Sequence, residues 1–207
     1  MMSFGIRTHL RNYFAAPRAL NDYATHIPIL IGLGKIRAIR SVLEFGCGRY
    51  STLTFLNRTT FPQLERLHSV ENDEAWAVTI HDDRWSLELV NGEIADAVAD
   101  LDLESFDLIL IDDSKTSAQR AATIRAVARQ QPQRPWIVIH DFEVDEYRKA
   151  AADFKYCHRF RAYNPETGVV AKGDLKRIDR VIRSKAKVFE PDAIERWVDS
   201  FNADLQD

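Results

Sequence analysis

The 207-residue chain has little of what marks several classes of protein. It contains only two cysteines, Cys47 and Cys157, which lie far apart and without the spacing of metal ligands. We therefore expect neither a disulfide framework nor a zinc site, and a reducing cytoplasm is the expected location. The formal net charge is only −3, so neither nucleic acid nor an anionic membrane is expected as a partner.

Long apolar runs are also missing. The longest, Ile27 to Leu33, contains Pro28 and is far shorter than the roughly 20 residues that a membrane-spanning helix needs. The first residues lack the basic segment, apolar core and small-residue cleavage site of a signal peptide. With 45% hydrophobic and 29% charged residues, the chain is expected to form one globular domain with its own core.

Short apolar segments alternate with helical segments through the middle of the chain. The predicted strands are 41–45, 66–71, 85–90, 106–112 and 135–139, and the predicted helices are 51–56, one from about 73 that contains Trp76 and Ile80, 94–101, 117–130 and 143–153. This alternation is typical of βαβ crossovers and a parallel sheet. The strand 106–112 is the most apolar, so we expect it in mid-sheet.

Two further regions flank this core. Residues 1–40 are expected to form a helical cover, with a first helix over 1–14 that could mediate a homodimer and a second over 23–39. Segments 155–161 and 167–171 predict an antiparallel hairpin, because the link between them is too short for a helix. The predicted organisation is one domain with a cover at 1–40, a core at 41–175 and a helical extension at 176–207.

Polar groups follow each predicted strand, and ligands of an open parallel sheet bind at these carboxyl ends. Gly46 and Gly48 predict a tight turn that a ligand can approach closely, because glycine has no side chain. Glu71 closes the second strand, where a carboxylate can accept both hydroxyls of a ribose. The later strands end in Asn91-Gly92-Glu93, Asp112-Asp113 and His140-Asp141.

Two cofactor classes compete for the glycine turn. The dinucleotide fingerprint G-x-G-x-x-G/A fits weakly, since Ser51 takes its third small position and Glu44 stands before the first glycine, which disfavours an NAD-binding oxidoreductase. The chain instead resembles the class I S-adenosylmethionine-dependent methyltransferases from about Ser41 to Lys172. The resemblance rests on Leu43 to Gly48, Ser69 to Asn72, Asn91 to Glu93, Asp107 to Asp112 and the terminal hairpin.

The resemblance implies a Rossmann-like α/β sandwich, with a mostly parallel seven-stranded sheet, an antiparallel C-terminal hairpin and helices on both faces. Gly46 and Gly48 would leave room for the methionine part, Glu71 would bind the ribose, and Glu93 would meet adenine. Tyr50 replaces a third glycine found in many members, so side chains of this loop are expected to hold the methionine end. The cofactor-binding residues implied are Glu44, Gly46, Gly48, Tyr50, Ser51, Glu71, Asn72, Gly92, Glu93 and Asp112.

Within the class, Tyr50-Ser51 and Ile111 to Lys115 are similar to the catechol-type O-methyltransferases of small molecules. Those enzymes hold Mg²⁺ with an aspartate and a later Asp-Asn pair, and a lysine deprotonates the acceptor hydroxyl. Here the later pair is His140-Asp141, without the asparagine. The resemblance implies methyl transfer to a small-molecule hydroxyl, with Lys115, His140 and Asp141 as catalytic residues; if Mg²⁺ binds, its ligands would be Asp112, His140 and Asp141.

Simpler interpretations stay open for several of these residues. His140 could be a hydrogen-bonded histidine at a strand end, and Lys115 an ordinary solvated residue. Arg120, Arg125 and Arg129 are expected on the solvated surface of their helix, with a rim for an acidic substrate as the alternative. The alternative function is a non-catalytic cofactor-binding module of the same fold.

Overall fold

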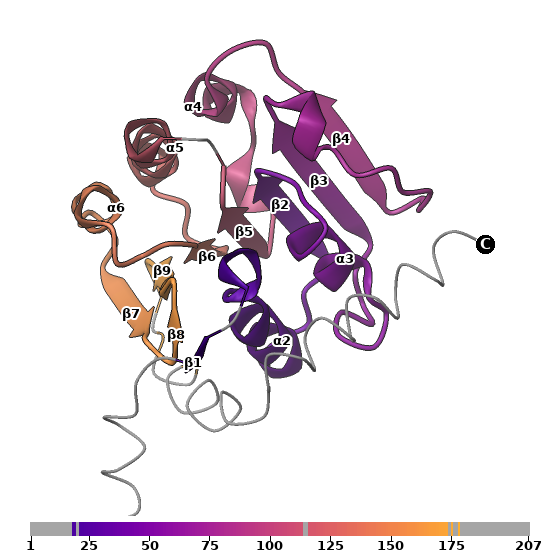
Figure 1. Cartoon of the computed structure of the whole chain (residues 1–207), viewed down its shortest axis with the longest axis horizontal. Coiled ribbons are helices and arrows are strands. Elements are labelled where there is room, and N and C mark those ends of the chain that lie inside the picture. Colours follow the sequence, from indigo (N-terminus) through magenta and orange to yellow (C-terminus); the bar gives the residue numbers. More distant parts are fainter. Residues whose placement is uncertain (1–17, 20, 114–115, 174, 176–177, 179–207) are drawn as a thin grey trace, which may run out of the picture.

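The computed structural model describes residues 18–19, 21–113, 116–173, 175 and 178 (Figure 1). Over this part of the chain, seven strands form one sheet in the order β4-β3-β2-β5-β6-β9-β7. The strands are β2 (Ser41–Phe45), β3 (Arg66–Glu71), β4 (Trp85–Leu89), β5 (Leu108–Ile111), β6 (Trp136–Ile139), β7 (Tyr156–Phe160) and β9 (Thr167–Ala171). A separate short ladder pairs β1 (Arg18–Ala19) with β8 (Tyr163–Asn164) in parallel.

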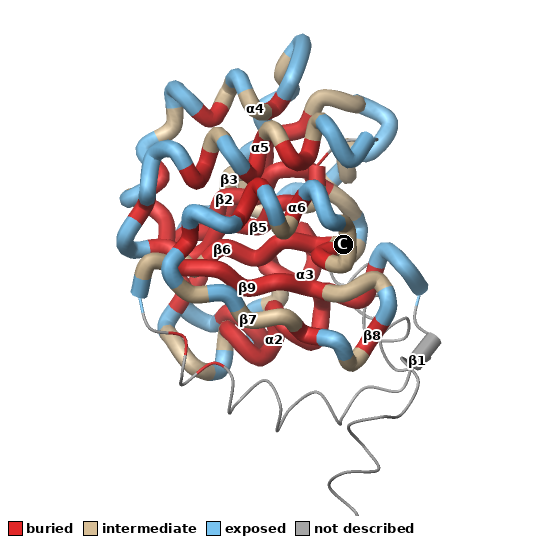
Figure 2. The backbone as a smooth tube through the Cα atoms, turned by 90° about the vertical axis from the view of Figure 1, so that its left-hand side faces the viewer, coloured by how far each residue is buried: buried red, intermediate tan, exposed pale blue. Residues whose placement is uncertain are grey.

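Helices cover both faces of the sheet, as Figure 1 shows. They are α2 (Ile27–Ile36), α3 (Ser51–Leu56), α4 (Ile94–Ala97), α5 (Ser117–Gln130) and α6 (Asp145–Ala150). Alternate residues of β5 pack into two different hydrophobic clusters, one on each face of the sheet. Leu108 and Leu110 pack in the cluster that contains α2 and α3, whereas Ile109 and Ile111 pack in the cluster that contains α4, α5 and α6. This two-sided burial explains why the strand is apolar throughout and confirms its place in mid-sheet (Figure 2).

The C-terminal strands confirm the predicted hairpin. β9 pairs antiparallel with β6 on one side and with β7 on the other, so the last of the described strands lies inside the sheet. Gly168 of β9 lies under Phe142, and a Cβ atom there would approach the Phe142 ring to 2.5 Å. The fold class is therefore the predicted one, a mostly parallel sheet with an antiparallel end.

The predicted helices near residues 73 and 23 differ from the structure. After Asp73 there is only a 3-10 turn, Glu74–Trp76, and the chain then continues without helix or strand to β4. The prediction failed because the segment buries no continuous apolar face: Ile80 packs against the core, but Trp76 is 49% exposed. The second helix of the cover begins at Ile27, after a 3-10 turn over Asp22–Ala24.

Some predictions concern residues outside the described part of the chain. They are the first helix over 1–14 with its homodimer contact, Lys115, and nearly all of the extension 176–207. The three-part organisation therefore remains a prediction. Within the described residues, no helix combines the length and the apolar character needed to cross a membrane.

Candidate functional site

The glycine turn after β2 requires glycine at its first position. Gly46 has a φ of +83°, and a Cβ atom there would lie 2.5 Å from the backbone oxygen of Asp112. Its N–H donates to the carbonyl of Val70 at 2.9 Å, so the turn brings the ends of β2, β3 and β5 together. Gly48 differs, because a Cβ atom there would meet nothing within 4 Å. The second glycine therefore borders open space.

Glu44 and Ser51 support this turn from inside the fold. The carboxylate of Glu44 is fully buried and accepts hydrogen bonds from Thr52 Oγ1 at 2.8 Å and Ser69 Oγ at 2.6 Å. Burial raises the pKa of Glu44 to about 7, although the hydroxyls of Ser51, Ser69 and Thr52 act in the opposite direction. Glu44, which was expected to bind the cofactor, is thus hydrogen-bonded to the start of α3 and to β3. Ser51, expected in the same role, is the first residue of α3 and hydrogen-bonds to Glu44.

Tyr50 joins the glycine turn to the N-terminal cover. Its hydroxyl accepts a hydrogen bond from Asn21 Nδ2 at 2.8 Å, and its ring packs against the core on the α2 side. The guanidinium of Arg49 lies 5.9 Å from the centre of the same ring. The side chain expected to hold the methionine end therefore contacts both the cover and Arg49.

Glu71 links the loops that follow the first two sheet strands. Its Oε2 accepts the N–H of Cys47 at 3.1 Å, and its Oε1 accepts the N–H groups of Asn72 and Asp73 at 2.8 and 2.9 Å. Burial raises the pKa of Glu71, and these N–H groups oppose that rise. A carboxylate offers about four acceptor positions, so roughly one remains for a ligand hydroxyl.

The third loop is tied to the same edge. Asn72 Nδ2 donates to the carbonyl of Gly92 at 2.8 Å, and Gly92 has a φ of +141° with open space where a side chain would lie. Glu93 accepts a hydrogen bond from Gln119 Nε2 at 2.9 Å, from the first turn of α5. The structure therefore gathers the residues predicted to bind an adenosyl group at one edge of the sheet.

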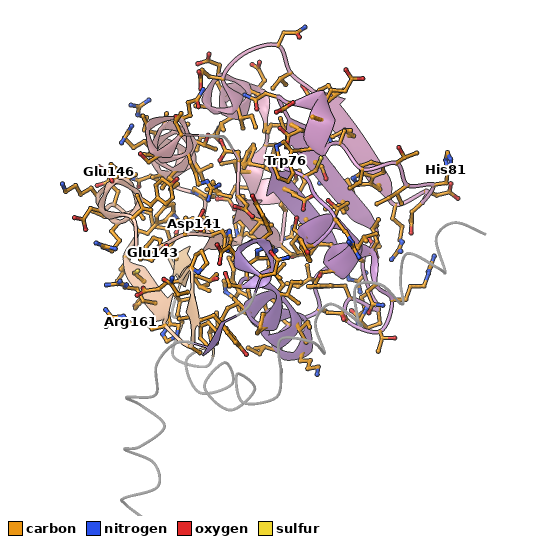
Figure 3. The ribbon with its side chains drawn as sticks, viewed as in Figure 1. Trp76, His81, Asp141, Glu143, Glu146 and Arg161 are labelled. Carbon is orange, nitrogen blue, oxygen red and sulfur yellow. The ribbon has the colours of Figure 1, made fainter. Side chains whose placement is uncertain are left out.

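Cys47 and Trp76 lie beside this edge. The thiol of Cys47 is buried and donates to the carbonyl of Trp76 at 3.8 Å. Burial, with the nearby carboxylates, raises the pKa of Cys47 to about 12, so it is a thiol and not a thiolate at neutral pH. Figure 3 shows Trp76 toward the middle of the view, whereas His81 of the same long loop lies at the outer edge beyond β4.

Four charged or polar side chains meet where β5 and β6 end. Asp112 Oδ1 lies 3.0 Å from His140 Nδ1 and 3.1 Å from Arg120 Nη1, and the same Nη1 lies 2.6 Å from Asp141 Oδ2. Burial would raise the pKa of Asp112, but His140 and Arg120 hold it well below its usual range. Burial would lower the pKa of His140, but Asp112 and Asp141 raise it above its usual value.

Arg120 is where the structure corrects the sequence interpretation. It was expected on the solvated surface, yet its side chain is only 8% exposed, and its Nε donates to the carbonyl of Asp113 at 2.6 Å. The sequence spacing could have indicated this burial. Arg120 stands four residues before Ile124 and seven before Val127, so it shares a helix face with these two buried residues. Arg125 and Arg129 lie on the other side of α5 and are exposed, as predicted.

The donor set expected for Mg²⁺ does not suit that ion. Asp112, His140 and Asp141 do lie together, with His140 Nδ1 3.7 Å from Asp141 Oδ1. However, Arg120 bridges the two carboxylates and occupies one oxygen of each. Mg²⁺ prefers octahedral oxygen coordination, and this set offers an imidazole and two carboxylates held by a guanidinium. These residues therefore do not fit Mg²⁺.

Two residues of the cover complete the cluster, and sequence reasoning missed both. Thr25 Oγ1 lies 2.7 Å from His140 Nε2, and the ring of His26 meets the ring of His140 edge-on with 4.8 Å between centres. His26 Nδ1 also lies 3.8 Å from Asp112 Oδ2. Burial and the nearby His140 lower the pKa of His26 to about 3. The only sequence signal was two polar residues at the start of an apolar helix.

No family model matches this chain, and a sequence search of curated proteins finds no match either. Solved structures do share its fold. Spermidine synthase from Thermotoga maritima matches with a TM-score of 0.55 and 15% identity, over 86% of this chain and 73% of that one. Human methyltransferase-like protein 13 in complex with SAH matches with a TM-score of 0.54 and 15% identity, over 81% and 94%. MycE methyltransferase from the mycinamycin biosynthetic pathway, in complex with Mg and SAH, matches with a TM-score of 0.50 and 14% identity, over 80% and 53%. Because the identities are this low, the likeness shows the fold alone, which is the Rossmann-like methyltransferase fold.

Proposed function

We propose that this protein is an S-adenosylmethionine-dependent methyltransferase that acts on a hydroxyl of a small molecule. The observation that carries the proposal is the hydrogen bonding among the three loops after β2, β3 and β4. Glu71 holds the glycine turn through Cys47, and Asn72 holds the third loop through Gly92. Open space borders both Gly48 and Gly92, as a cofactor lying across these loops requires.

The chemistry assigns different tasks to the two halves of the site. The acceptor oxygen attacks the methyl carbon in line, the C–S bond breaks, and its electron pair returns to sulfur, so that the sulfonium becomes a neutral thioether. The acceptor must also lose its proton, and its oxygen must be held in line. In our proposal the glycine turn, Glu71 and Asp112 bind the cofactor, and His140 and Asp141 face the acceptor. Lys115 is the proposed base, and it lies outside the described residues.

Calorimetric titration tests the cofactor assignment. We expect heat with S-adenosylmethionine and S-adenosylhomocysteine, and none with NAD. Glu71→Ala should abolish this binding, because its carboxylate both orders the loops and offers the remaining acceptor position. Glu65→Ala is the matched control, since Glu65 is exposed and pairs with Arg40 at the surface. If neither adenosyl compound gives heat, the proposal is refuted. If Glu71→Ala binds the cofactor with unchanged affinity, the ribose assignment is refuted.

Turnover separates the enzyme from the alternative, a cofactor-binding module without catalysis. A library of small-molecule hydroxyl compounds is incubated with methyl-labelled cofactor, and label transfer is measured. Binding without transfer to any acceptor would favour the module. Because spermidine synthase shares the fold, decarboxylated S-adenosylmethionine belongs in the same titration. A preference for that compound would point to aminopropyl transfer in place of methyl transfer.

A further inference from the structure

His26 places a buried imidazole at the start of α2. Its side chain is 1% exposed, and within the described part of the chain neither Nδ1 nor Nε2 has a hydrogen-bond partner. Buried polar atoms in proteins are nearly always satisfied, so two unsatisfied nitrogens on one ring require an explanation. The ring points toward other potential ligands, because His140 and Asp112 lie beside it.

We propose that His26, Asp112 and His140 bind one divalent transition-metal ion such as Zn²⁺. One ligand atom from each residue can be chosen so that all three lie within 4.8 Å of one another. Two imidazole nitrogens with one carboxylate oxygen form a donor set typical of zinc sites that keep a further position open, and imidazole favours transition metals over Mg²⁺. The expectation of no zinc site rested on cysteine spacing, and this set contains no cysteine.

The surrounding contacts support the same ligand atoms. A metal-bound histidine usually donates its other ring N–H to a neighbour, and Thr25 Oγ1 lies 2.7 Å from His140 Nε2, which leaves Nδ1 for the ion. Arg120 Nη1 lies 3.1 Å from Asp112 Oδ1, so Oδ2, the oxygen that faces His26, stays available. The ion would thus replace the direct contact between His140 Nδ1 and Asp112.

This site differs from the Mg²⁺ site suggested by the sequence, because His26 takes the place of Asp141. Asp141 keeps its ion pair with Arg120 at 2.6 Å and serves as the counter-charge that allows Arg120 to stay beside the site. The ligands come from the ends of β5 and β6 and from the start of α2. If the proposed methyltransferase function holds, an open metal position would receive the acceptor oxygen; metal binding itself does not depend on that function.

The test uses the full chain without an affinity tag, stripped of metal with EDTA and desalted. Titration with Co²⁺ should give visible absorption bands of a low-coordinate site at one ion per chain, and Zn²⁺ should displace them. We expect His26→Gln and Asp112→Asn to weaken binding by at least about 100-fold, because each removes a ligand. His81→Ala is the matched control, since His81 is exposed and far from the cluster (Figure 3).

Absence of Co²⁺ bands and of bound Zn²⁺ in the wild-type protein would overturn the proposal, and unchanged binding in His26→Gln would remove His26 from the site. Near-ultraviolet circular dichroism checks that each variant is folded. Should a variant not fold, the wild-type protein still decides, because Zn²⁺ must raise its melting temperature if the site exists. S-adenosylhomocysteine titration of the metal-free protein runs in parallel, so a failure of metal binding and a failure of cofactor binding are distinguished.

Discussion

Arg120 lies between two partly buried carboxylates, Asp112 and Asp141. Its Nη1 lies 2.6 Å from Asp141 Oδ2 and 3.1 Å from Asp112 Oδ1, and its Nε donates to the carbonyl of Asp113 at 2.6 Å. Arg120→Leu keeps apolar contact with the core but leaves these groups without the guanidinium. Breaking a buried ion pair by removing one partner costs about 3–5 kcal/mol, and we expect a loss of stability in that range.

Urea denaturation at pH 7, followed by circular dichroism, measures this loss. Arg125→Leu is the matched control, because Arg125 is exposed on the same helix, and its effect should stay within about 0.5 kcal/mol. A loss below about 1 kcal/mol in Arg120→Leu would refute the reasoning, since it would mean that the two carboxylates are satisfied without the guanidinium.

The same comparison has a pH dependence with a definite sign. His140 and Arg120 hold the pKa of Asp112 below its usual range despite burial. This contribution is therefore present above the unfolded pKa of about 3.9 and is lost as the pH falls through the folded value. The difference in stability between the wild-type protein and Arg120→Leu should shrink below about pH 4. A difference that stays constant down to pH 2 would contradict the electrostatic origin of the effect.

Two further changes test other parts of the fold. Asp107 accepts N–H groups from Arg40 and Ser41 and pairs with Arg134, and these contacts lower its pKa although burial alone would raise it. Asp107→Asn should therefore lower the free energy of unfolding by about 2–3 kcal/mol at pH 7, as measured by urea denaturation. The difference from the wild-type protein should shrink as the pH falls below about 4. An equal loss at pH 2 and pH 7 would contradict this reasoning. Gly46→Ala should cost at least about 2 kcal/mol and weaken S-adenosylhomocysteine binding, because φ is +83° and the backbone of Asp112 leaves no room; wild-type stability would show that the turn can relax.

The sheet and the strand-end residues were predictable because they follow from local patterns. An apolar segment such as Leu108–Ile111 is buried on both faces wherever it lies in a parallel sheet, and its end must meet the ends of its neighbours. Asp112, His140 and Asp141 therefore came together as expected. The hairpin was equally constrained, since a short link allows no crossover.

The rest of the candidate site depends on contacts that no local pattern encodes. His26 reaches Asp112 from a helix that precedes the sheet, and nothing in its neighbourhood in sequence specifies that contact. Arg120 is a charged residue, for which solvent exposure is the normal expectation, and its burial is allowed only by carboxylates that arrive from β5 and β6. In the loop before β4, Ile80 packs against the core but Trp76 is exposed, a difference that helix propensity alone does not reveal.

The contact between Thr25 and His140 also constrains the order of events during synthesis. The two residues are 115 positions apart, and β1 pairs with β8 across a still longer separation. A nascent chain that has produced the glycine turn and β5 still lacks the histidine that the cover must meet. The cluster can therefore close only after β6 and His140 have left the ribosome.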